Sequence, residues 1–85
     1  AALDAGRWPL RRAAVALLRR QHPSASRVTL ERVLLTDTHA IVRAEAAKAL
    51  AEVEGAEAAL ERASRLDASE AVQEAARRAL ASTFD

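Results

Sequence analysis

The sequence predicts an all-α domain built from repeated helical hairpins, and three observations support this fold class. Alanine, the strongest helix former, supplies 23 of the 85 residues. Val and Ile together supply only seven, which is too few for a sheet. Finally, the segment 37–50 (DTHAIVRAEAAKAL) returns thirty residues later as 67–80 (DASEAVQEAARRAL), so the chain contains an internal repeat.

The repeat divides each full unit into a first helix, a turn that begins at Asp, and a second helix. From Val42 the apolar residues follow the spacing i, i+4, i+7, i+8, which is one face of a helix. Upstream, the same offset relates Leu30 to Leu60, and it predicts first helices over about 27–36 and 56–66. The residue pairs shared by the two repeated segments are Asp37/Asp67, Val42/Val72, Ala46/Ala76, Ala49/Ala79 and Leu50/Leu80.

A partial copy opens the chain and predicts a lone second helix. Asp4, Leu10, Ala14, Leu17 and Leu18 follow the same order, with one extra residue near Pro9. One domain over 1–85 is therefore expected to hold a partial unit 1–22 and full units 24–54 and 55–83, five helices in all. Because a helical pair exposes an apolar face until a neighbour stacks on it, we expect a fragment of a longer array. Its bare end, beside the leucines of the partial copy, predicts some self-association.

Local signals mark the breaks between units. Pro23 excludes a helix between the first two units, and Ser24 or Ser26 can cap the helix that follows. Gly55 lies where the second helix of unit 24–54 is expected to end.

The repeated residues resemble HEAT-like repeats, in particular the short bacterial variety shared with phycobilisome lyases. Asp37 followed by Val42-Arg43 and then AAKAL fits that pattern, and the second copy fits with one change, at Gln73. The resemblance implies a right-handed α-solenoid of about two and a half repeats. It also implies a ladder between neighbouring units, with Gln73 losing one rung or reducing it to a neutral hydrogen bond. The ladder residues would be Asp4, Arg11, Asp37, Arg43 and Asp67. Helix capping is the alternative role for the three Asp residues, and both roles are compatible.

Composition and charge exclude several classes of partner. The net charge is +1, but residues 1–32 carry seven Arg against two acids, while residues 33–85 carry six basic and ten acidic residues. The basic strip therefore ends abruptly, which disfavours nucleic acid. The longest apolar run, Ala13–Leu18, is too short to span a bilayer, and no signal peptide is visible. A cytoplasmic location is expected.

No catalytic or metal constellation is present in the sequence. The chain has no Cys, and neither His22 nor His39 has a second His at metal-ligand spacing. We expect His39 to be a solvated turn residue. No Gly-x-Ser-x-Gly elbow or phosphate-binding Gly-rich loop occurs. The sequence therefore predicts a protein that is not an enzyme and that has no catalytic residue, metal or cofactor.

The expected function is a protein–protein interaction or scaffold module that uses the face lined by the second helices. In curved helical arrays these helices line the concave surface. Trp8 either covers the end of the core or anchors an interface. The alternatives are a non-catalytic segment of a larger enzyme such as a bilin lyase, a nucleic-acid-binding domain, and a spacer. The residues expected on the partner-binding face are Arg12, Arg19, Arg20, Glu45, Lys48, Glu52 and Arg78.

Overall fold

The computed structural model describes residues 7–21 and 24–83, and in this part of the chain helices are joined by turns and no strand occurs. The all-α prediction is confirmed, and so is the number of helices within the described residues. Asp4, His22 and Pro23 lie outside them. The five helices are α1 Trp8–Gln21, α2 Arg27–Thr36, α3 Ala40–Leu50, α4 Glu57–Leu66 and α5 Glu70–Thr83.

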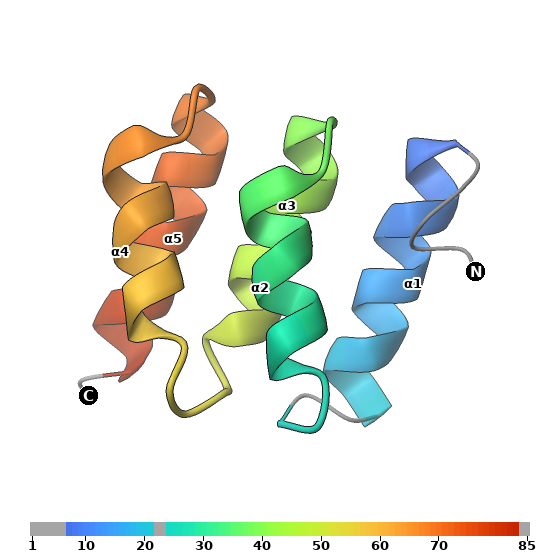
Figure 1. Ribbon diagram of the computed structural model, residues 1–85, viewed down its shortest axis with the longest axis horizontal. Helices are drawn as coiled ribbons and strands as arrows, with labels where there is room; N and C mark the ends of the chain where they lie inside the picture. The colour runs from blue at the N-terminus through green and yellow to red at the C-terminus, as the bar shows by residue number, and fades with distance from the viewer. Residues whose placement is uncertain (1–6, 22–23, 84–85) are drawn as a thin grey trace.

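The helices form two layers (Figure 1). α3 is central: it packs against α1 on one side, α5 on the other, and α2 across the layers. α4 packs against α5 in the same way that α2 packs against α3, and α2 and α4 touch more lightly. One layer therefore holds α1, α3 and α5, and the other holds α2 and α4. The molecule measures 34 × 27 × 15 Å along its principal axes.

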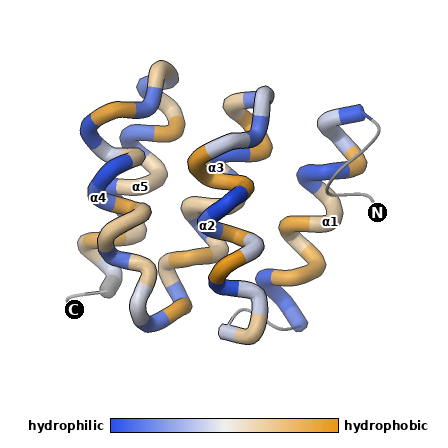
Figure 2. The backbone as a smooth tube through the Cα atoms, in the orientation of Figure 1, coloured by the Kyte–Doolittle hydropathy of each residue, from blue (hydrophilic) through white to orange (hydrophobic). Residues whose placement is uncertain are grey.

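The core lies between the two layers and is built from leucine and valine at the repeated positions. Alanine supplies much of the remaining core, and Ala46 and Ala76, for example, are fully buried. Figure 2 shows hydrophobic stretches alternating with hydrophilic ones along the helices, as burial of one side requires. The largest fully buried side chains are Val15, Leu30, Leu34, Val42, Leu50, Leu60 and Val72.

Two equivalent turns join the layers. α2 ends at Thr36 and α4 at Leu66, and the Asp that follows each helix takes an extended backbone conformation (φ −63° and ψ 141° at Asp37, φ −64° and ψ 140° at Asp67). The carboxylate of each Asp accepts a hydrogen bond of 2.9 Å from the backbone N–H two residues later, which belongs to His39 in the first turn and Ser69 in the second. Such local side-chain bonds stop a helix because they offer the backbone another partner.

The predicted end of the second helix at Gly55 is wrong, since α3 stops at Leu50. The chain then tightens through bonds between residues three apart, including one of 3.1 Å from the N–H of Val53 to the carbonyl of Leu50. This tightening brings Val53 into the core at 4% exposure. Gly55 instead reverses the chain before α4, with a φ of +88° that disfavours other residues.

The entry into α2 differs from the expectation in one detail. Ser26 takes the N-cap position, but its side chain makes no capping hydrogen bond. Its carbonyl accepts the first intrahelical bond, 2.8 Å from the N–H of Leu30.

Candidate interaction surface

Two bidentate ion pairs connect each unit to the next. The Nε and Nη2 atoms of Arg11 donate to the Asp37 carboxylate at 2.9 and 3.2 Å. Arg43 contacts Asp67 in the same way, at 3.0 and 3.2 Å. The four side chains are between 6 and 16% exposed, so both pairs are largely shielded from water. These contacts fix neighbouring units relative to one another, and they hold the second helices in one layer.

The Asp37 carboxylate has competing influences on its pKa. Burial alone would raise the pKa. Hydrogen bonds from Arg11 and the His39 N–H, with the positive charges of Arg11 and Arg43, outweigh burial and hold the pKa of Asp37 below its ordinary value. The residue is therefore an ionised structural anion rather than a candidate proton donor.

Arg43 and Gln73 occupy equivalent positions and make one bond in common. Nη1 of Arg43 donates to the Asp37 carbonyl at 2.8 Å, and Nε2 of Gln73 donates to the Asp67 carbonyl at 2.8 Å. Each side chain thereby closes the turn of its own unit. Gln73 keeps a neutral hydrogen bond within its unit.

His39 is half-buried, which contradicts the expected solvated turn residue. Its ring stacks on Trp8, with 4.3 Å between ring centroids and an interplanar angle of 18°. Its Nδ1 accepts a hydrogen bond of 3.2 Å from the N–H of Ile41, so the side chain also caps α3. Trp8 packs against the edge of the core at the same time.

The seven residues expected on the partner-binding face are distributed along one layer. Arg12, Arg19 and Arg20 lie on α1, Glu45 and Lys48 on α3, Glu52 just after α3, and Arg78 on α5.

Two ion pairs on this face cross from α1 to the α3 region. Arg12 meets Glu45 at 3.3 Å, and Arg19 meets Glu52 at 3.4 Å. The arginine side chains are 51 and 37% exposed, and exposed pairs contribute only about 0.2–1 kcal/mol each. Such pairs exchange partners at little cost in stability.

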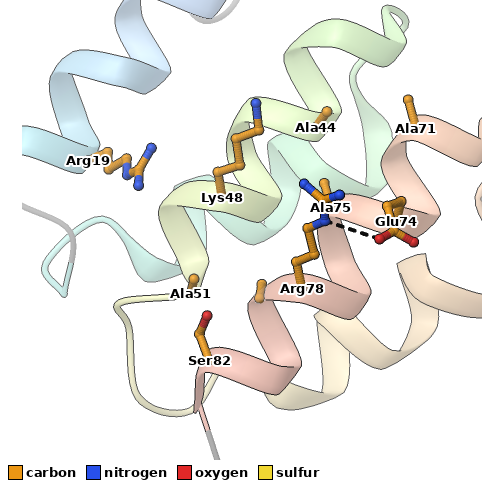
Figure 3. Close-up of a pocket in the computed structure, with 10 residues that line it drawn as sticks. Arg19, Ala44, Lys48, Ala51, Ala71, Glu74, Ala75, Arg78 and Ser82 are labelled. Atoms are coloured by element: carbon orange, nitrogen blue, oxygen red, sulfur yellow. Dashed lines mark hydrogen bonds and ion pairs between the residues drawn. The ribbon is translucent and has the colours of Figure 1, made fainter. Parts of the chain in front are cut away.

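A groove lies between α3 and α5 and is shown in Figure 3. We call it the α3–α5 groove; its volume is about 440 Å³. Its apolar lining is entirely alanine, and its polar lining carries three cations and one carboxylate. The lining residues are Arg19, Ala44, Lys48, Ala51, Ala71, Glu74, Ala75, Arg78, Ala79 and Ser82.

Two of the three cations that line the groove form ion pairs, and the third does not. Arg78 pairs with Glu74 at 3.1 Å within α5, drawn as a dashed line in Figure 3, and Arg19 pairs with Glu52. Lys48 is exposed and forms no ion pair with any residue that the structure describes. The groove therefore presents an unpaired ammonium group beside a floor of methyl groups.

A second hollow, between α1 and α3, also has a volume of about 440 Å³. Trp8 and Pro9 line its end, and Ala13 and Ala16 supply its apolar side. The Arg12–Glu45 pair lies in its wall. Both hollows thus open on the layer of second helices.

The sequence predicted three charged residues that line the groove, Arg19, Lys48 and Arg78, but not the alanines that form its apolar surface. Ala71, Ala75 and Ala79 were overlooked as lining residues because alanine carries no chemical signal of its own. Their positions on α5, at intervals of four residues, could have indicated a flat strip beside α3.

Comparisons of the chain with protein-family models, curated proteins and solved structures found no match. None of the helices in the described part of the chain has the length and hydropathy needed to cross a bilayer. Across residues 7–21 and 24–83, no three His, Cys, Asp or Glu side chains are grouped where they could hold a metal ion.

Proposed function

We propose that the chain is a segment of a right-handed HEAT-like α-solenoid and serves as a protein–protein interaction or scaffold module. The partner docks on the layer of α1, α3 and α5. The proposal rests on the α3–α5 groove, which combines an alanine floor with the unpaired Lys48. The repeated packing of α2 on α3 and of α4 on α5 supports the solenoid.

The groove suits an acidic peptide segment with small or apolar residues beside its carboxylates. Alanine methyl groups allow a partner backbone to approach the helices closely. A carboxylate near Lys48 would gain a charge-assisted hydrogen bond without displacing an existing partner. Arg19 and Arg78 can contribute as well, because the exposed pairs that occupy them are weak.

Affinity capture with matched baits tests this function. The native chain is compared with Lys48→Glu, which reverses charge in the groove, and with Ala71→Leu, which fills it. Arg65→Glu is the matched control, because Arg65 is an exposed cation on α4, in the other layer. We expect a partner that the native and Arg65→Glu baits retain and both groove variants lose.

The retained protein would then be measured against the purified chain by isothermal titration. A partner that survives both groove changes, or that Arg65→Glu loses equally, would contradict docking in the α3–α5 groove.

A further inference from the structure

α4 and α5 lie at the end of the array opposite to α1 (Figure 1), and the residue that joins one unit to the next changes there. Arg11 contacts Asp37 as Arg43 contacts Asp67, so Arg11 corresponds to Arg43. The thirty-residue repeat relates Arg43 in turn to Gln73. This position is therefore a cation in α1 and α3, where a unit follows, and a neutral amide in α5.

The same register identifies a second position that changes in α5. Val15 is fully buried in α1, whose main packing partner among the described helices is α3, so Val15 faces the next unit. Its counterpart Ala47 is fully buried in α3. The next counterpart is Arg77 in α5, whose side chain is 54% exposed. An arginine therefore stands where the two earlier helices bury an apolar side chain.

The first helices show a parallel change. Leu34 is fully buried in α2, and its counterpart thirty residues later, Ser64 in α4, is only half-buried. Nη1 of Arg77 donates to the Ser64 carbonyl at 3.4 Å, so the changed positions of α4 and α5 lie beside each other. We call the surface formed by Ser64, Gln73 and Arg77 the outer face.

The polar groups of the outer face are bonded within their own unit. Nε2 of Gln73 donates to the backbone carbonyl of its own turn at 2.8 Å. The Ser64 hydroxyl donates to the Glu61 carbonyl at 2.7 Å. Arg77 pairs with Glu74 at 3.4 Å. The outer face thus satisfies its hydrogen bonds without a neighbour, as the polar outer face of a terminal repeat does.

On the basis of the solenoid proposed above, we further propose that the outer face is a terminal cap, on which no further unit of this kind stacks. Stacking would cover the Arg77 guanidinium, and a charge that leaves water needs a new partner. Stacking would also gain no bidentate ion pair, because the Gln73 amide lacks the charge and the planar fork of arginine. The α2–α3 hairpin therefore accepts a following unit, and the α4–α5 hairpin excludes one.

Two chains of equal length, each with one added unit, test the cap. In the inserted chain, residues 1–55 are followed by 26–85, so the added unit follows the α2–α3 hairpin. In the appended chain, residues 1–80 are followed by 51–85, so the added unit follows the α4–α5 hairpin. Total helical ellipticity should rise by about a third in the inserted chain, because two further helices fold. It should not rise in the appended chain, since a hairpin that buries no face against a neighbour stays unfolded.

Three substitutions in the first α4–α5 hairpin should convert the appended chain. Ser64→Leu, Gln73→Arg and Arg77→Ala together copy the α2–α3 hairpin at these positions. We expect the ellipticity and the urea m value to rise as in the inserted chain, since the m value grows with the surface buried. Ala58→Leu with Arg78→Ala is the matched control, at positions that are exposed in both hairpins, and should change neither quantity. Circular dichroism of the same variants without an added unit verifies that they fold.

Two results would overturn the cap alone. The unsubstituted appended chain could gain the same ellipticity as the inserted chain, or the three substitutions could leave the appended chain without added helix. If the inserted chain gained no helix, stacking of units would fail, and the proposed solenoid would fall together with the cap.

Discussion

The turn at Asp37 and the turn at Asp67 have the same backbone and different surroundings. In both, the Asp carboxylate accepts a bidentate pair from the preceding unit and a bond from the N–H two residues later. The first turn also carries Arg43, whose guanidinium reaches Asp67 in the next unit, and His39, whose ring stacks on Trp8. The second carries Gln73 and Ser69 at those positions.

Comparing Arg43 with Gln73 distinguishes two roles of this position: closing the turn of its own unit and contacting the next unit. Closing the turn needs only a donor to the Asp carbonyl, and arginine and glutamine both supply it at 2.8 Å. Joining the next unit needs further donors in a planar fork, which only the guanidinium has. Arg43 therefore belongs to two units, whereas the Gln73 bond stays within one.

The largest effect is expected from Arg43→Ala. It removes the bond to the Asp37 carbonyl and leaves Asp67, whose side chain is 8% exposed, without its cation. A loss of about 3 kcal/mol in the free energy of unfolding should follow, at the low end for a shielded pair. Urea denaturation followed by circular dichroism at pH 7 measures it.

Two further variants separate the contribution of the carbonyl bond from that of the ion pair between units. Arg43→Gln copies the second turn, keeps the carbonyl bond, and should cost about 2 kcal/mol. Gln73→Ala removes only the carbonyl bond and should cost about 1 kcal/mol. Equal losses for Arg43→Ala and Gln73→Ala would show that the contact between units contributes nothing.

Lowering the pH should reduce the stability that the turn at Asp37 contributes to the folded chain. Because the pKa of Asp37 is lower in the folded chain than in the unfolded one, its stabilising contribution is complete above the unfolded value of about 4. It is lost as the pH falls through the lower folded value. The free energy of unfolding should therefore decrease from about pH 5 downward.

Asp37→Asn should be less stable than the native chain at pH 7 and should show a smaller decrease in acid. Glu61→Gln is the control, because Glu61 is an exposed carboxylate on α4 with no ion pair among the described residues. Urea midpoints at a series of pH values report both variants. A native-like acid profile for Asp37→Asn would rule out this source of pH dependence.

The thirty-residue repeat was enough to predict the order of the helices and the bounds of α2. The recurring Asp and Arg also mark residues that meet between units in the structure. Periodicity could not predict that α3 stops at Leu50, since the bonds that tighten the chain there depend on Val53 reaching the core. Nor could it predict the α3–α5 groove, because its depth depends on how closely two helices pack.

The Trp8–His39 stack was equally inaccessible to the sequence, because the two rings belong to different units and meet only once α1 is docked. The stack is the remaining difference between the turns, and His39→Ser tests it by placing the residue of the second turn in the first. Serine is a good N-cap, so the capping of α3 should survive while the ring contact is lost. We expect a loss of about 1 kcal/mol in the free energy of unfolding. Trp8 is the one tryptophan of the chain, so its fluorescence reports the change directly, with emission shifting to longer wavelength as the ring becomes wetter.

Ser69→His is the matched control for this prediction. In the register set by Arg11 and Arg43, the residue of the preceding helix that corresponds to Trp8 is Ala40, so a histidine at position 69 gains no ring to stack on. Its stability and the Trp8 emission should stay close to those of the native chain. If His39→Ser also left both unchanged, the ring contact would have no energetic weight, and the first turn would depend on Arg11, Asp37 and Arg43 alone. If Ser69→His destabilised the chain as much as His39→Ser, the effect would come from histidine and serine as turn residues rather than from the stack between units.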